Sequence, residues 1–151
     1  MGRAIAGVIL GYLAMLVVLF VMFTGAYLAM GAERAFKPGV YDVSMLWIVM
    51  SFAVSIAAAV LGGVVCAAVA GRRSGPVMAL AILVLVLGLV MAIPTLGART
   101  DPGPRSGDVP NLEAMTKAQT PAWIALLNPL IGAAGVLAGG QLLAPKGTPK
   151  A

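Results

Sequence analysis

Four long stretches of this chain carry no charged residue, and they constrain the fold more than any other feature of the sequence. They cover residues 4–32, 43–71, 74–98 and 118–145. A transmembrane helix needs about 20 mostly apolar residues, because the hydrocarbon core is roughly 30 Å thick and each residue rises about 1.5 Å. All four stretches are longer than this. The sequence therefore predicts an all-α polytopic membrane protein, a single domain built as a four-transmembrane-helix bundle.

The composition points in the same direction. Hydrophobic residues make up 61% of the chain and charged residues 10%, whereas a soluble domain has about 25% charged residues. This excludes a soluble enzyme, a disordered tail and a nucleic-acid-binding arm. There is no histidine, and Cys66 is the single cysteine, which excludes zinc sites and paired-cysteine redox chemistry. We expect no catalytic residues, no metal, no cofactor and no nucleic-acid partner, and we expect the lipid bilayer as a partner.

Local signals refine the helix ends. We expect helices over about 4–32, 43–71, 75–97 and 119–144, and an outer loop over 99–117. Ser74 and Thr120 are candidate N-caps, each followed by a proline suited to a first helical turn. The turn-rich part of the loop, 101–107, is expected to be mobile, and 110–119 to form a short interfacial helix. The first apolar stretch exceeds the 7–15 residues of a signal-peptide core, so a retained helix is favoured over a cleaved signal.

The orientation of the bundle is less strongly determined. With four spans, each side of the membrane receives five of the ten Lys and Arg residues, so the positive-inside rule does not decide. All five acidic residues fall on the side that holds the two longer loops, and the compact Arg72–Arg73 pair falls on the side of the termini. We therefore expect both termini in the cytoplasm. The Ala, Gly and Arg usage and the short loops favour a bacterial inner membrane.

Small residues recur at helical spacing on several of the predicted helices. Because lipid gives helices no hydrophobic reason to associate, close backbone contact through small residues is the usual cause of packing. We interpret these residues as an internal helix-packing seam, with a partner-binding surface at Gly7 and Gly11 as the alternative. Cys66 is expected to act as a small apolar residue. The seam consists of Gly7, Gly11, Ala59, Gly63, Ala67, Gly71, Gly132, Gly135 and Gly139.

A few polar residues interrupt the apolar helices at similar expected depth, in the outer half of the membrane. The candidate polar layer consists of Thr24, Ser51, Ser55 and Asn128. Pro129 has no N–H, so it frees the carbonyl of Ala125 beside Asn128. Two interpretations follow. The layer either forms hydrogen bonds that hold the helices together or lines an outward-facing polar pocket.

Ionisable residues are absent from all four spans. Such residues usually mark proton relays, ion paths and substrate sites in membranes, so a proton-coupled exporter and a hydrolase are excluded. We predict a non-enzymatic accessory or scaffold subunit that packs against other membrane proteins or against itself. The alternative is a small uniporter, channel or lipid-handling protein that uses the outward-facing polar pocket.

Overall fold

The computed structural model of the chain describes residues 2–97, 102–105 and 107–143. This part of the chain is all-helical, and four of its helices are long and apolar enough to cross a membrane. They suggest a multi-pass membrane protein. In chain order the elements are α1 (Gly2–Ala35), α2 (Met45–Val69), α3 (Ser74–Ala92), the 3-10 turn η1 (Ile93–Leu96), α4 (Asn111–Lys117) and α5 (Ala122–Leu142).

The predicted spans match the long helices, but several of their ends differ. The helix α1 passes the charged pair Glu33–Arg34 and reaches Ala35. The helix α2 begins only after Ser44, whose side chain accepts a hydrogen bond from the amide of Trp47. Pro94 lies in the 3-10 turn that continues α3. The short helix expected between residues 110 and 119 is present as α4.

The two predicted N-caps are wrong. Arg73 occupies the N-cap of α3, and Ser74 is the first residue of the helix. Pro121 occupies the N-cap of α5, one residue after Thr120. No side-chain hydrogen bond caps either helix. The expected first-turn proline is present in α3 as Pro76, whereas Pro121 lies one residue before α5 begins.

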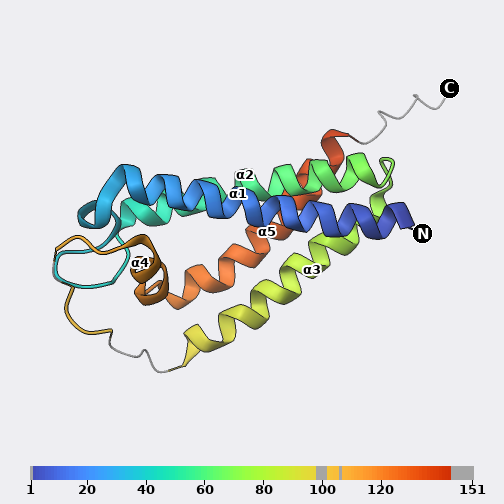
Figure 1. Cartoon of the computed structure of the whole chain (residues 1–151). Coiled ribbons are helices and arrows are strands. Elements are labelled where there is room, and N and C mark those ends of the chain that lie inside the picture. The colour runs from blue at the N-terminus through green and yellow to red at the C-terminus, as the bar shows by residue number, and fades with distance from the viewer. Residues whose placement is uncertain (1, 98–101, 106, 144–151) are drawn as a thin grey trace.

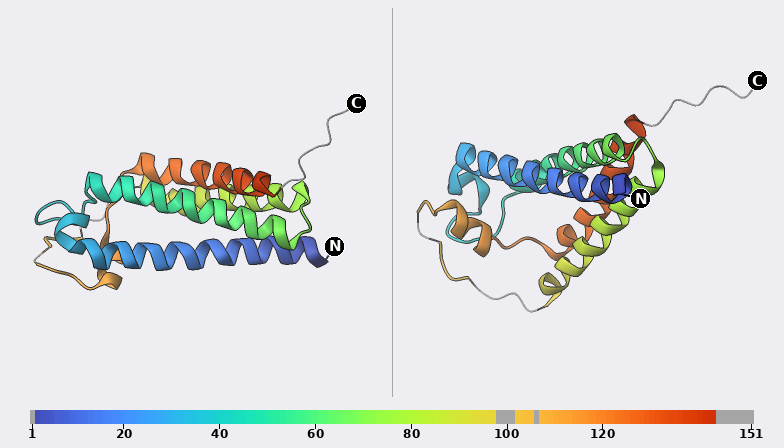
Figure 2. Two further views of the ribbon diagram at one scale, coloured as in Figure 1. Left: turned by 90° about the horizontal axis from the view of Figure 1, so that it is seen from above. Right: turned by 45° about the vertical axis from the view of Figure 1, so that its right-hand side comes forward.

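The long helices pack side by side in the order α1, α2, α5, α3. The helix α2 packs against α1 on one side and against α5 on the other, and α3 packs mainly against α5 (Figure 1). The helices α1 and α3 lie close together near the N-terminus and diverge toward the other end of the bundle (Figure 2). We call the end with the N-terminus and residues 70–73 the hairpin end. The opposite end, with α4 and residues 36–44 and 102–121, is the cap end.

Glycines allow the closest approaches between the helices. A β-carbon added at Gly11 of α1 would lie 2.8 Å from the carbonyl oxygen of Gly62 of α2. At Gly135 of α5 it would lie 2.7 Å from the β-carbon of Ala59. Such distances are shorter than real contacts between non-bonded carbon atoms. Any larger residue at these positions would therefore push the helices apart.

The other residues of the predicted seam fall into three groups. Gly7 faces the carbonyl oxygen of Cys66, Gly63 faces that of Val136, and Gly139 faces that of Val60. Gly132 lies against the side chain of Val84, and Ala67 is buried. Gly71 makes no packing contact, so its inclusion in the predicted seam was wrong. It is exposed, has no neighbouring atom within 4 Å of an added β-carbon, and adopts a φ of 72° that ends α2.

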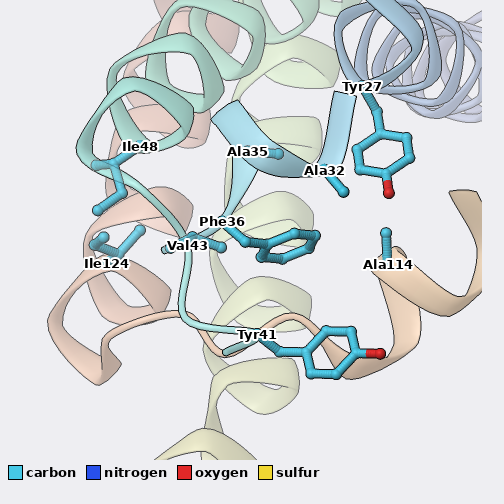
Figure 3. Close-up of a cluster of buried hydrophobic side chains, with 9 residues drawn as sticks. All are labelled: Tyr27, Ala32, Ala35, Phe36, Tyr41, Val43, Ile48, Ala114 and Ile124. Atoms are coloured by element: carbon cyan, nitrogen blue, oxygen red, sulfur yellow. The ribbon is translucent and has the colours of Figure 1, made fainter. Parts of the chain in front are cut away.

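The cap end is folded around a cluster of aromatic and small side chains (Figure 3). Gly31, with a φ of 71° and a ψ of 168°, breaks the helical geometry of α1 and turns residues 32–35 toward this cluster. Isolated backbone bridges join Phe36 to Val43 and Asp42 to Gln119. The cap cluster consists of Tyr27, Ala32, Ala35, Phe36, Tyr41, Val43, Ile48, Ala114 and Ile124.

The long loop is tied to this cluster by polar contacts, although the sequence predicted a mobile segment there. The side chain of Arg105 is 2% exposed, forms an ion pair of 3.2 Å with Glu33, and donates to the carbonyl of Gly107. Its guanidinium group lies 5.9 Å from the ring centroid of Phe36. Tyr27 donates a hydrogen bond of 2.7 Å to the carbonyl of Val109. The described part of segment 101–107 is therefore held against α1.

Candidate functional site

An apolar crevice begins where α1 diverges from α3 and continues between α1 and α4. It contains two adjoining cavities, of about 390 Å³ and about 570 Å³, which share Leu19 and Phe23 of α1 as lining residues. The smaller one, the central cavity, lies among α1, α2, α3 and α5 and is lined by Ser55, Met91 and Asn128, among others. Volumes of roughly 300–1,000 Å³ are typical of ligand sites. Both cavities are therefore large enough to hold a side chain or a small apolar group.

The larger cavity lies beside the cap and is called the cap cavity. Residues of α1 form one wall, and Asn111, Ala114 and Met115 of α4 form another. Its aromatic lining residues include Phe20, Tyr27, Phe36 and Trp47. The rings of Tyr27 and Trp47 pack edge to face, with their centroids 6.2 Å apart. This cavity depends on the folded loop, because α4 supplies one of its walls.

Asn128 contributes a buried polar atom without a partner to the central cavity. Its Oδ1 atom is buried, and no hydrogen bond joins its side chain to another residue in the part of the chain that the structure describes. The next residue, Pro129, packs against Gly88 of α3, where an added β-carbon would lie 2.6 Å from Cγ of the proline. A buried amide without a hydrogen bond costs about 1–3 kcal/mol. The buried carbonyl oxygen of Asn128 is therefore available to a hydrogen-bond donor that enters the cavity.

The described hydrogen bonds do not join the predicted polar layer into one group. Ser51 donates to the carbonyl of Ile48 in its own helix, at 2.7 Å. Thr24 accepts from the side-chain amide of Asn111 in α4, at 3.4 Å. Only Ser55 and Asn128 line the same cavity. The hydrogen bonds of Thr24 and Ser51 therefore go to partners other than Asn128.

Both of these hydrogen bonds have clear physical causes. A serine inside a helix can satisfy its hydroxyl group on the preceding turn of its own backbone, and Ser51 does so. Thr24 finds its partner in α4, 87 positions away along the chain. The prediction of a polar layer considered only residues of the long helices, whereas the partner of Thr24 lies in the loop between α3 and α5.

Charged groups lie at the cap, outside the long apolar helices. The hydroxyl of Tyr41 donates to Oε1 of Glu113 at 2.7 Å, and Nζ of Lys117 donates to the same atom at 3.0 Å. The hydrogen bond from Tyr41 and then that from Lys117 lower the pKa of Glu113 below its ordinary value. The same hydrogen bonds raise the pKa of Lys117 and that of Tyr41. This trio fixes α4 to the segment that precedes α2.

The lining of the crevice is mostly apolar. The lining of the central cavity is apolar except for Ser55 and Asn128, and it contains no titratable side chain. Over residues 2–97, 102–105 and 107–143, no three His, Cys, Asp or Glu side chains come together as metal ligands. Cys66 is buried, beside the closest approach of α1 to α2. The crevice offers apolar walls and one amide group that can donate and accept hydrogen bonds.

Comparison with family models, with curated proteins and with solved structures finds no match for this chain.

Sequence reasoning identified Asn128 and Ser55 but missed most of the walls around them. Met91 and Gly88 of α3 and Phe23 of α1 belong to the central cavity. One signal in the sequence could have led to part of this wall, namely a small residue on another helix against which Pro129 could pack. Which residue that would be depends on how α3 and α5 cross, and neither helix has a polar stripe that would reveal its rotation.

Proposed function

We propose that this chain is a non-enzymatic accessory subunit of the bacterial inner membrane, and that it packs against a transmembrane helix of another membrane protein. The partner helix would lie in the crevice between α1 and α3. Both termini would face the cytoplasm, as the placement of the acidic residues favours. The observation that carries the proposal is the unpartnered amide of Asn128 in an apolar cavity.

The amide favours a partner helix over lipid as the occupant of the crevice. Acyl chains could fill the apolar walls, but they have no group that hydrogen-bonds Asn128. A side chain such as Ser, Thr, Asn or Gln on a neighbouring helix could satisfy the amide. Hydrogen bonds of this kind contribute about 0.6–2 kcal/mol to helix association in membranes.

The shape of the crevice agrees with the same occupant. The helices α1 and α3 diverge toward the cap end (Figures 1 and 2), and the crevice is lined by exposed apolar residues such as Phe20 and Met91. A partner helix would cover these side chains and bring polar groups to Ser55 and Asn128. The partner would be another protein or a second copy of this chain.

The second candidate is a small uniporter, channel or lipid-handling protein. The cap cavity favours the lipid-handling form, because its lining is almost entirely apolar and its volume of about 570 Å³ lies in the range of ligand sites. A lipid held there would contact the aromatic residues Phe20 and Trp47 and the wall formed by α4.

Copurification separates the two candidates. The chain is extracted from its native membrane in a mild detergent, as wild type, as Asn128→Leu and as the control Leu126→Ala. Leu126 lies on α5 outside the lining of both cavities. A stoichiometric membrane-protein partner, or a second copy, that is retained by wild type and Leu126→Ala and lost from Asn128→Leu supports the accessory subunit.

The other outcomes contradict this proposal. A chain that copurifies with lipid or a small molecule, and with no further protein, supports the second candidate. A partner retained equally by all three forms would show that association does not use Asn128.

A further inference from the structure

Three arginines lie together at the hairpin end. Arg72 and Arg73 form the turn between α2 and α3, and Arg3 lies in the first turn of α1. A hollow of about 450 Å³ separates the start of α1 from this turn and is lined by Arg3, Ala70 and Arg73, among others. All three arginines are exposed. The hollow is therefore a basic site open to the surroundings of the bundle.

These guanidinium groups have no carboxylate partner among the described residues. The ion pairs that the structure describes use Lys37, Arg105 and Lys117, all at the cap end. The acidic side chains of the chain also lie in the segments 33–42 and 101–113. The positive charge of the hairpin end is thus not neutralised by side chains of the described residues, and an anionic ligand would complement it.

A second hollow, of about 170 Å³, lies on the other side of the arginine pair, between α3 and α5. Polar residues, Arg72, Arg73, Ser74 and Gln141, line part of it, while Val77, Met78 and Leu137 provide an apolar wall. The side chain of Met78 is exposed on the surface of the bundle. The arginine pair therefore stands beside an apolar surface that continues along α3.

The backbone holds the arginine pair in a defined place. The amide of Arg72 donates to the carbonyl of Ala67 at 2.7 Å, and Arg72 adopts a φ of 61°, a conformation that a side chain other than glycine rarely takes. No side chain caps the N-terminus of α3 directly after the pair. The unpaired first-turn amides add to the positive potential that the guanidinium groups supply.

We propose that Arg72 and Arg73, with Arg3, bind the phosphate headgroup of an anionic phospholipid. The phosphate would lie at the guanidinium groups, and an acyl chain would lie along the apolar wall of Val77, Met78 and Leu137. Basic pockets at the ends of transmembrane helices bind anionic headgroups in this manner. A free phosphate would use the same arginines, but it would gain nothing from the apolar wall. This site is independent of the crevice and of Asn128.

Native mass spectrometry of the full-length chain tests the proposal. The protein in detergent is titrated with phosphatidylglycerol or with neutral phosphatidylcholine, and the affinity for each lipid is measured. The test variant is Arg72→Gly/Arg73→Gln, because glycine adopts the backbone of residue 72 without strain. The control is Arg34→Gln/Lys37→Gln, which removes two exposed cations at the cap end.

We expect wild type and the control to bind phosphatidylglycerol more tightly than phosphatidylcholine. We expect the test variant to bind phosphatidylglycerol about 30-fold more weakly, as follows from the contribution of each basic residue near an anionic headgroup. Equal binding of both lipids by wild type would overturn the proposal, and so would an equal loss in the control. Inorganic phosphate that competes fully at equimolar concentration would identify a site for free phosphate instead of lipid.

Discussion

Gly63 of α2 lies against the backbone of Val136 in α5, so that a β-carbon at position 63 would collide with the carbonyl oxygen of Val136. The amide nitrogen of Gly140 lies 3.0 Å from the same point. Neither group is the end of a flexible side chain. The separation of α2 and α5 therefore depends on the missing side chain at position 63.

This contact predicts the effect of filling the position. Gly63→Ala should lower the free energy of unfolding by about 1–3 kcal/mol, the usual cost of overpacking, and Gly63→Leu should lower it further. Gly25→Ala is the matched control, because a β-carbon there meets no atom within 4 Å. The control should keep or raise stability, since alanine favours a helix over glycine. Thermal unfolding in detergent measures both, and equal tolerance at the two positions would contradict the close contact.

Replacing Asn128 should have the opposite effect on stability from filling position 63. Because the buried Oδ1 atom of Asn128 has no partner in the described chain, Asn128→Leu in the purified protein should leave the free energy of unfolding unchanged or raise it by about 1–3 kcal/mol. Ser51→Ala is the comparison variant for Asn128→Leu, because it removes a polar group that already has a hydrogen bond within its own helix. Unfolding in detergent is the measurement. A marked loss of stability in Asn128→Leu would show that the amide has an internal partner.

The cap should loosen in acid. The pKa of Glu113 is lowered in the folded state by Tyr41 and Lys117, so its contribution is present above the ordinary value near 4.5 and is lost as the pH falls through the folded value. The pKa values of Lys117 and Tyr41 are raised in the folded state, so their contribution to stability is present at neutral pH. It is lost at alkaline pH, as the pH rises above their ordinary values and through the folded ones.

A spin label at the exposed position Leu112 of α4 measures this change. In the Leu112→Cys/Cys66→Ala chain, the label should become more mobile as the pH falls below the ordinary glutamate range. Adding Glu113→Gln should give a label whose mobility no longer changes there. A label whose mobility is independent of pH in both chains would mean that Glu113 does not hold α4.

The orientation is tested by labelling single cysteines in a Cys66→Ala background. Cysteines at Ser74 and at Asp108 lie at opposite ends of the bundle by the order of the helices. An impermeant thiol reagent should label Asp108→Cys in intact cells, and Ser74→Cys only after the membrane is opened. A reporter fused after Ala151 should behave as cytoplasmic. Labelling of Ser74→Cys in intact cells would reverse the orientation.

The sequence predicted the four long helices because charges end the apolar stretches, and charge is a local property. Gly31 was not recognised as a break, since glycine is common within these helices and only its φ of 71° distinguishes it. The cap was missed for a different reason. Its contacts join residues far apart in the chain, such as Glu33 with Arg105 and Tyr41 with Glu113. No spacing within a segment predicts such pairs.

The candidate site was predicted in part for similar reasons. Asn128 stands out in the sequence as an amide residue within an apolar stretch and directly before a proline, which is a local signal. Its surroundings depend on the rotation and crossing of four apolar helices that have no polar stripe. Similar expected depth therefore did not predict that Thr24 bonds Asn111 and that Ser51 bonds its own helix.

The central claim is that a transmembrane helix of another polypeptide occupies the crevice beside Asn128. A photoreactive amino acid at Met91, which lines the central cavity, tests it directly in native membranes, with Val49 on the exposed face of α2 as the control position. The account predicts one discrete protein crosslink from position 91 that is absent from position 49 and lost when Asn128→Leu is added. Crosslinks from position 91 to lipid alone would contradict it.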